Sequence, residues 1–172
     1  MKKKLVFIVL VCLLSSCFSI KPGVTKTGAK CWEEFYVSPG VNQYFIKPLL
    51  FKSAHGEFVV DFTFRNSADS VTINFNLIDT NPISPKDSIC LINSRDTVQI
   101  KSRQPLFNSQ SDKTHKIRET GKLAFSDFDQ LISSPEGFAV RRNTSISYSP
   151  TRKTLNSLQQ IKTKLLDVEL IK

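Results

Sequence analysis

The stretch FVVDFTFRNSADSVTINFNL, residues 58–77, carries the clearest structural signal in this chain of 172 residues. Large apolar side chains occupy every second position in both of its halves: Phe58, Val60, Phe62 and Phe64 in the first, and Val71, Ile73, Phe75 and Leu77 in the second. A period of two is what a strand with one buried face requires. The polar stretch 66–70 between the halves is rich in side chains that bond their own backbone in turns. The sequence therefore predicts an antiparallel hairpin with one face in the core.

Shorter strand-like stretches surround this hairpin. Before it, residues 44–52 cluster aromatic and aliphatic side chains around Pro48, which indicates a sheet edge or a bulge. After it come candidate strands at 88–93, 97–101, 116–125 and 138–148, a loop with two prolines at 81–87 and a polar, mobile loop at 108–114. Such spacing predicts a mainly β fold, an antiparallel β-sandwich with an immunoglobulin-like arrangement as one option. The alternative is an α+β fold in which the C-terminal helix covers an antiparallel sheet.

Two helices are expected. A short one at 125–133 has Ser126 as its cap, and Phe128, Leu131 and Ile132 fall on one side. An amphipathic helix of about 18 residues follows the pair Ser149 and Pro150, which supply an N-cap and a first-turn proline. Its apolar stripe consists of Leu155, Leu158, Ile161, Leu165 and Val168. We expect this stripe to pack on the sheet, because an isolated helix of this length is only marginally stable in water.

The N-terminus has the three parts of a secretory signal. Three lysines at 2–4 precede the apolar run 5–14, and the sequence Leu-Ser-Ser-Cys follows and ends at Cys17. A run of about ten apolar residues is too short to span a bilayer comfortably. The motif at 14–17 resembles the lipobox of bacterial lipoproteins. This resemblance, which covers residues 1–17 only, implies cleavage before Cys17 and attachment of diacylglycerol to its sulfur.

This resemblance divides the chain into a signal peptide (1–16), a lipidated flexible tether (17–30) and a single globular β-rich domain (31–172). Two or more acyl chains give stable membrane attachment. Because Phe18 rather than aspartate follows the cysteine, the resemblance favours the outer membrane, and the acid-free tether favours its periplasmic face. In that compartment nucleic acid is not an expected partner.

Composition agrees with a folded domain attached by lipid. Hydrophobic residues make up 40% of the chain and charged residues 23%, and 13 phenylalanines argue against disorder. Loss of the signal removes three lysines and no acid, so the formal charge falls from +9 to +6. No second long apolar run follows the signal.

Two cysteines remain once Cys17 carries lipid. Cys31 and Cys90 could form one disulfide in an oxidising compartment, or they could be two separately buried thiols. A metal site is disfavoured, because no histidines lie at ligand spacing from them. We expect no metal and no cofactor.

A basic segment at 137–166 contains no acid. Its cations are Arg141, Arg142, Arg152, Lys153, Lys162 and Lys164. Such a segment can attract phosphates of lipid headgroups or anionic polysaccharide. The alternative is an ordinary solvated face that keeps the protein soluble.

Catalytic motifs are missing from the sequence, including HExxH, GxSxG and a glycine-rich phosphate loop. His55 and His115 lie near no nucleophile in sequence, which disfavours a hydrolase. We therefore expect a lipid-anchored, non-enzymatic binding or assembly module for a partner protein or an envelope component. The alternative function is a binder of an anionic lipid, glycan or small molecule through the basic segment.

Overall fold

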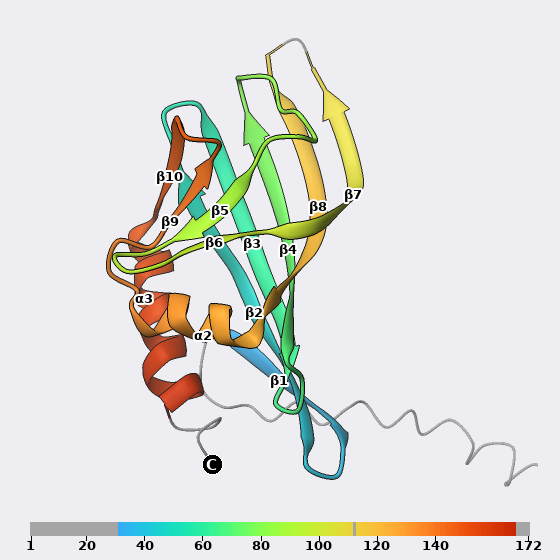
Figure 1. Cartoon of the computed structure of the whole chain (residues 1–172), viewed down its shortest axis with the longest axis vertical. Helices are drawn as coiled ribbons and strands as arrows, with labels where there is room; N and C mark the ends of the chain where they lie inside the picture. Colours follow the sequence, from blue (N-terminus) through green and yellow to red (C-terminus); the bar gives the residue numbers. More distant parts are fainter. Residues whose placement is uncertain (1–30, 112, 168–172) are drawn as a thin grey trace, which may run out of the picture.

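A computed structural model describes residues 31–111 and 113–167. Ten strands form one antiparallel sheet in the order β6-β5-β9-β10-β2-β3-β4-β8-β7, with β1 beside β2. The sheet curls until it nearly closes into a barrel (Figure 1). The predicted class, mainly β and antiparallel with one short and one C-terminal helix, is confirmed. The facing layers of the predicted sandwich are the opposite walls of this barrel.

The first five strands are β1 (Trp32–Ser38), β2 (Val41–Lys52), β3 (Gly56–Arg65), β4 (Ser70–Asp79) and β5 (Ile89–Ile92). The other five are β6 (Thr97–Gln99), β7 (Lys101–Gln110), β8 (His115–Ala124), β9 (Ala139–Arg142) and β10 (Ile146–Pro150). The helical segments are α2 (Phe125–Ser133), α3 (Arg152–Gln160) and the π-helix η2 (Ile161–Leu166). None of the helices in the described residues is long and apolar enough to cross a membrane.

The predicted hairpin is the pair β3–β4. Val60 lies opposite Phe75 and Phe62 opposite Ile73 in its register, and all four side chains are fully buried. The intervening positions face outward and are partly exposed. The expected bulge at Pro48 is also present, as a register shift in β2, and it marks where β2 changes its outer neighbour from β1 to β10.

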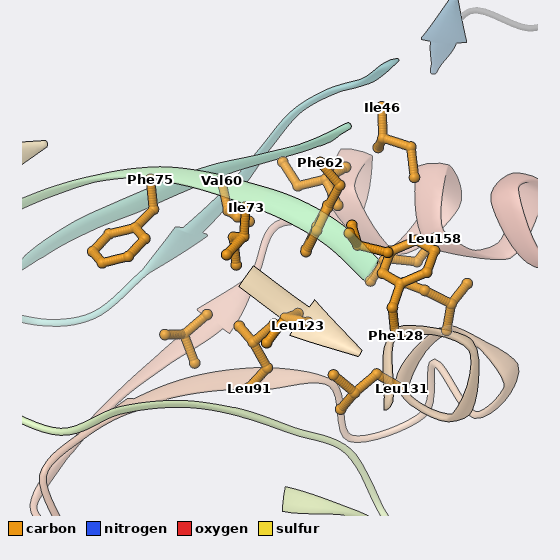
Figure 2. Close-up of a cluster of buried hydrophobic side chains, with 14 of the residues drawn as sticks. Ile46, Val60, Phe62, Ile73, Phe75, Leu91, Leu123, Phe128, Leu131 and Leu158 are labelled. Carbon is orange, nitrogen blue, oxygen red and sulfur yellow. The ribbon is translucent and has the colours of Figure 1, made fainter. Parts of the chain in front are cut away.

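Aliphatic and aromatic side chains from both walls form one buried core, part of which is drawn in Figure 2. Phe62 of β3 meets Phe128 of α2 with ring centroids 5.2 Å apart. Leu158, Ile161 and Leu165 of the C-terminal helix are fully buried, so this helix packs on the domain as predicted. Leu155, which was expected in the same stripe, is 41% exposed because it lies on the outer side of α3, and Val168 lies outside the described residues. The helices thus close the apolar end of the core.

The helix starts differ from the prediction. Ser149 and Pro150 end β10, where they pair with Lys52 and Phe51 of β2, so they cannot begin the helix. Thr151 is the N-cap instead, and its side chain accepts the N–H of Thr154. In α2 the cap position is Ala124, without a side-chain hydrogen bond, so Ser126 is not the cap.

Strand β7 was not predicted in full. The expected mobile loop at 108–114 is shorter, because β7 continues to Gln110 and β8 begins at His115. Positions 104–110 are exposed on both faces, which leaves no alternation for a sequence pattern to reveal. The single strand expected at 138–148 is two strands, β9 and β10, joined by a turn.

One continuous stretch closes the barrel. The sheet path starts at β6 and ends at β7, and these two strands are separated only by Ile100. The chain pairs with β5 through β6 and then crosses to pair with β8 through β7 (Figure 1). At the crossing, a Cβ on Gly121 would lie 2.9 Å from the side chain of Ile100. Glycine at this position therefore permits the close approach.

Candidate functional site

The crossing at Ile100 leaves two gaps in the barrel wall, one on each side of the closing stretch. We call the first the filled gap: it lies between β7 and the loop 80–88 that leads into β5. The second is the open gap, between the β6 residues 97–99 and the β8 residues 122–124. The loop fills the first gap, whereas no described segment fills the second. Together the two gaps contain the side chains and backbone groups most able to bind a ligand or to take part in a reaction.

In the filled gap, one arginine holds the loop to the sheet. Nη2 of Arg103, on β7, donates to the carbonyl oxygens of Pro85 at 2.8 Å and Asp87 at 2.6 Å. Its Nη1 lies 3.2 Å from Oε2 of Glu119 on β8, and both side chains are largely buried. A single guanidinium therefore connects β8, β7 and the loop.

The carboxylate of Asp87 extends this connection to the β9–β10 turn. Its Oδ1 accepts from Nδ2 of Asn143 at 2.9 Å, and its Oδ2 accepts the N–H of Ser84 at 3.0 Å. The Asn143 side chain in turn accepts the N–H of Ser88 at 2.9 Å. Oδ2 of Asp87 also lies 3.9 Å from Nε of Arg142. The loop is thus tied down at both of its ends.

Arg142 leads on to a buried pair at the end of β4. Its Nη1 lies 3.7 Å from Oδ2 of Asp79, which also accepts a hydrogen bond from the hydroxyl of Tyr148. Oδ1 of Asp79 accepts the N–H of Asn81 at 2.8 Å. Tyr148 is fully buried, and Asp79 and Arg142 are 1% and 3% exposed.

These groups form one charge network, largely buried, that connects β4, β7, β8, β9 and β10 with the loop 80–88. Its ionisable members are Asp79, Asp87, Arg103, Glu119, Arg142 and Tyr148. Burial raises the pKa of Glu119, although the Arg103 charge opposes this. Burial, followed by the hydrogen bond to Asp79, raises the pKa of Tyr148 well above its usual range.

A buried ion pair contributes little net stability, but removing one partner is costly because the other charge is left alone. The network therefore specifies where the loop 80–88 lies. Its members line neither the groove of the open gap nor the smaller hollow beside it, both described below. We interpret the network as a closure of the barrel and not as a reaction centre.

A groove of about 380 Å³ occupies the open gap. Its lining residues are Thr97, Val98, Gln99, Lys101, Lys122, Leu123, Ala124 and Asp127. A smaller hollow of about 160 Å³ lies around the register shift in β7, where Ser102 has a positive φ of 53°, and it shares Lys122 with the larger groove.

Backbone groups of β6 point into this groove. In an antiparallel ladder, successive residues direct their N–H and C=O groups to opposite neighbours. Ile100 donates its N–H to Ile89 of β5 at 2.9 Å, so Val98 faces β5 as well. The N–H and C=O groups of Thr97 and Gln99 therefore face the open gap. In the described residues (31–111 and 113–167), no strand pairs with them there.

The opposite rim, formed by β8, also directs a backbone group into the gap. Phe125 donates its N–H to Asp69 at 2.7 Å, so the backbone N–H and C=O groups of Leu123, two residues earlier, face β4 as well. The N–H of Ala124 then points away from β4 and toward the gap. The groove thus has backbone hydrogen-bonding groups on both rims.

Two lysines stand side by side at one end of the groove. Lys101 and Lys122 are register partners in the β7–β8 ladder, and both side chains are exposed. In the part of the chain that the structure describes, neither takes part in an ion pair. Like charges placed directly opposite each other on a sheet repel. The pair therefore makes this end of the groove attractive to an anionic group.

Beyond the crossing, β7 forms an exposed arm, residues 104–110. Leu106 is 56% exposed and Phe107 50% exposed, and the arm extends with β8 at the end of the barrel opposite β1 (Figure 1). Pro105 lacks an N–H, and a register shift follows it. Both features protect an edge against strand pairing. The arm consequently offers apolar side chains rather than a backbone edge.

The two predicted cysteine partners do not meet. Cys31 and Cys90 are free thiols, so the proposed disulfide is absent. Cys31 is buried, and its Sγ donates to Oε1 of Gln160 at 3.6 Å. Cys90 lies on β5 at an outward position between the buried Ile89 and Leu91. Different parts of the barrel hold the two thiols, and burial raises the pKa of Cys31.

The six cations of the basic segment do not form one surface. Arg142 is buried in the charge network, because its position in β9 faces inward, and it is not available to an external anion. Arg141 faces the other way. The exposed cations that remain begin α3 (Arg152 and Lys153) or belong to η2 (Lys162, partly buried, and Lys164).

The predicted lipidation site Cys17, the signal 1–16 and the tether 17–30 lie outside the described residues. Within the described residues, no group of three or more His, Cys, Asp or Glu side chains is arranged to hold a metal ion. Comparison with family models, with curated proteins and with solved structures finds no match for this chain.

Apart from Arg142, which was assigned to a basic surface, the residues of both gaps were missed from the sequence, although two left a signal. Glu119 lies in phase with the buried Ile117 and Leu123, and Asp79 continues the buried phase of Leu77. A charged residue at an inward position of a strand is expected to have a buried partner. The open gap left no such signal, since it depends on where β6 and β7 separate.

Proposed function

We propose that this protein is an envelope lipoprotein, anchored through lipid on Cys17, whose β-barrel domain binds a partner protein and has no catalytic activity. The lipobox-like sequence at 14–17 supports the anchor, and Phe18 after the cysteine favours the outer membrane and its periplasmic side. In the described residues, the buried charges of the barrel interior are paired with one another or hold the loop 80–88, which supports a binding role over a catalytic one.

The observation that carries this proposal is the arm of β7. Leu106 and Phe107 expose about half of their large apolar side chains on a strand that is solvated on both faces. Adjacent apolar side chains held out by a rigid element are typical of protein-binding surfaces. Because Pro105 and the register shifts prevent sheet extension, a partner would bind these side chains by packing.

A crosslinking experiment in intact envelopes tests the proposal. A photoreactive amino acid at position 107 should give a discrete crosslinked product, and Leu106→Ser should greatly reduce it. Tyr36→Ser is the matched control, because Tyr36 is also 56% exposed but lies on β1, away from the arm. A product that depends on Tyr36 and not on Leu106 would refute the arm as the binding surface. Cys17→Ser should abolish palmitate labelling, and labelling that persists would refute the anchor.

A further inference from the structure

The open gap combines two features that no other part of the described chain combines. Its β6 rim presents the N–H and C=O groups of Thr97 and Gln99 to solvent, and its β7–β8 end presents the unpaired cations Lys101 and Lys122. Backbone edges bind other backbones in extended conformation, and side chains beside the edge select the sequence. An adjacent pair of ammonium groups selects a carboxylate.

We propose that the groove in the open gap binds an extended peptide segment of a partner protein, one that carries an acidic residue, by adding it as a short strand beside β6. The acidic side chain lies between Lys101 and Lys122, and the peptide backbone exchanges hydrogen bonds with Thr97 and Gln99. This inference rests on the proposed function, since it specifies how one segment of the partner is bound.

The filled gap supports this mode of closure. There, the chain closes the space beside β7 with its own loop, through carbonyl oxygens that accept hydrogen bonds from Arg103. The open gap offers backbone groups of β6 instead of a side-chain donor, and in the described chain no segment occupies it. Three residues of the β6 edge span about 10 Å, which matches a segment of three to four extended residues.

Charge favours an acidic segment as the occupant and disfavours the chain's own tether. The chain's own tether contains Lys21, Lys26 and Lys30 and no acid, so the two groove lysines would repel it. Asp127 lines the α2 end of the groove and opposes a second acid there. The acidic residue of the ligand therefore belongs at the lysine end of the groove.

The test uses the full chain in detergent and a pentapeptide probe, threonine-valine-glutamate-valine-threonine with blocked ends. Backbone hydrogen exchange should slow at Thr97, Gln99 and Ala124, whose N–H groups face the gap, when the peptide binds. Lys122→Ala and Lys101→Ala should each weaken binding about tenfold or more, as expected for loss of a charge-assisted contact. Lys116→Ala is the matched control, because Lys116 lies on the same strand and face but outside the groove, and its binding should not change.

Two further probes separate strand addition from simple anion binding. A peptide methylated at alternate backbone nitrogens keeps the glutamate but loses the backbone donors, and it should not bind. If it binds as well as the parent, or if glutarate alone competes fully, the groove is an anion site only and the proposal is wrong. Exchange that is already slow at Thr97 and Gln99 in the free protein would mean that the chain itself or a second copy fills the groove, and this would also overturn the proposal.

The peptide-binding experiment and the crosslinking experiment can fail independently, so the groove and the proposed function are tested separately. If crosslinking from position 107 succeeds but no peptide slows exchange at 97–99, the partner-binding role stands and the groove is not its peptide site. If the peptide binds but no crosslink forms at position 107, the groove stands and the arm is excluded as the partner-binding surface.

Discussion

The filled gap and the open gap arise from one event, the crossing of the chain from β5 to β8 at Ile100, and the protein treats them in opposite ways. Beside β7, charged side chains face inward, are buried, and hold the loop 80–88 against the strand. Beside β6, the charged side chains face outward, have no ionic partner in the described residues, and leave a groove. Where the backbone hydrogen bonds between two strands end, side-chain donors can thus close the gap, as they do in the filled gap. The gap can also stay open to a ligand, as we propose for the open gap.

The difference also separates structural from functional charge. Buried charges contribute mostly by making alternative arrangements costly, because any separation leaves an unpaired charge in a low dielectric. Exposed like charges cost a little in the free protein and can be neutralised by a ligand. Substitutions in the filled gap should therefore lower stability, whereas substitutions in the open gap should alter binding and leave stability nearly unchanged.

The largest effect is expected for Arg103→Met, which keeps the apolar stem and removes the charge and donors. Glu119 would be buried without a cation, and the carbonyls of Pro85 and Asp87 would lose their donor. We expect a loss of about 3–5 kcal/mol in the free energy of unfolding, measured by urea denaturation. Arg118→Met, on the adjacent exposed position of β8, is the control and should change stability by less than about 0.5 kcal/mol. Equal losses in both variants would remove the distinction between buried and exposed charge.

The next effect concerns the crossing that creates both gaps. Gly121→Ala places a Cβ 2.9 Å from Cγ2 of Ile100, and the crossing strand must move to accommodate it. Overpacking of this kind costs about 1–3 kcal/mol, again measurable in urea. Because both gaps meet at this point, hydrogen exchange should accelerate at residues 80–88 and 97–99 together. Acceleration in only one of them would show that the gaps are independent.

Whether a strand of this fold could be predicted from the sequence depends on whether one of its faces is buried and the other exposed. The hairpin β3–β4 was predicted correctly because Phe58 to Phe64 and Val71 to Leu77 alternate between core and solvent. Leu158, Ile161 and Leu165 of the C-terminal stripe were correct for the same reason, with a period set by the helix, whereas Leu155 was wrong. Strand β7 has no buried face beyond Arg103 and therefore gave no periodic signal.

The charge network could not be predicted, because its members come together only through the fold. Arg142 and Asp79 are 63 positions apart and meet because β9 and β4 end at the same mouth of the barrel. The sequence placed Arg142 in a basic segment with Arg141, although adjacent residues of a strand face opposite sides. Local charge density was thus a poor guide to which cations share a surface.

A pH-dependent effect should distinguish the filled gap further. Burial raises the pKa of Glu119 in the folded protein above its ordinary value of 4.5. The folded state then keeps a proton that the unfolded state has lost, so the contribution of Glu119 to stability falls as pH rises above about 4.5. The stability difference between the wild type and Glu119→Gln should therefore shift against the wild type between about pH 4 and pH 7. A difference that does not vary with pH would mean that Arg103 fully offsets the burial of Glu119.

The smallest expected effect belongs to the open gap and has the opposite sign. In the free protein, Lys101 and Lys122 repel each other across the β7–β8 ladder, and nothing in the described chain neutralises them. Lys122→Gln removes this repulsion and keeps the length of the side chain, so it should raise the free energy of unfolding by about 0.2–1 kcal/mol at low salt.

Salt is the internal check on that prediction, because ions screen exposed charges strongly at about 1 M ionic strength, where the Debye length is only about 3 Å. The gain should then largely disappear. Lys116→Gln, on the same face of β8 and opposite Ser109 rather than a lysine, should show no comparable gain at either salt concentration. If Lys122→Gln instead lowers stability, Lys122 already has an anionic partner in the free protein. The open gap would then be closed by the chain itself, as the filled gap is.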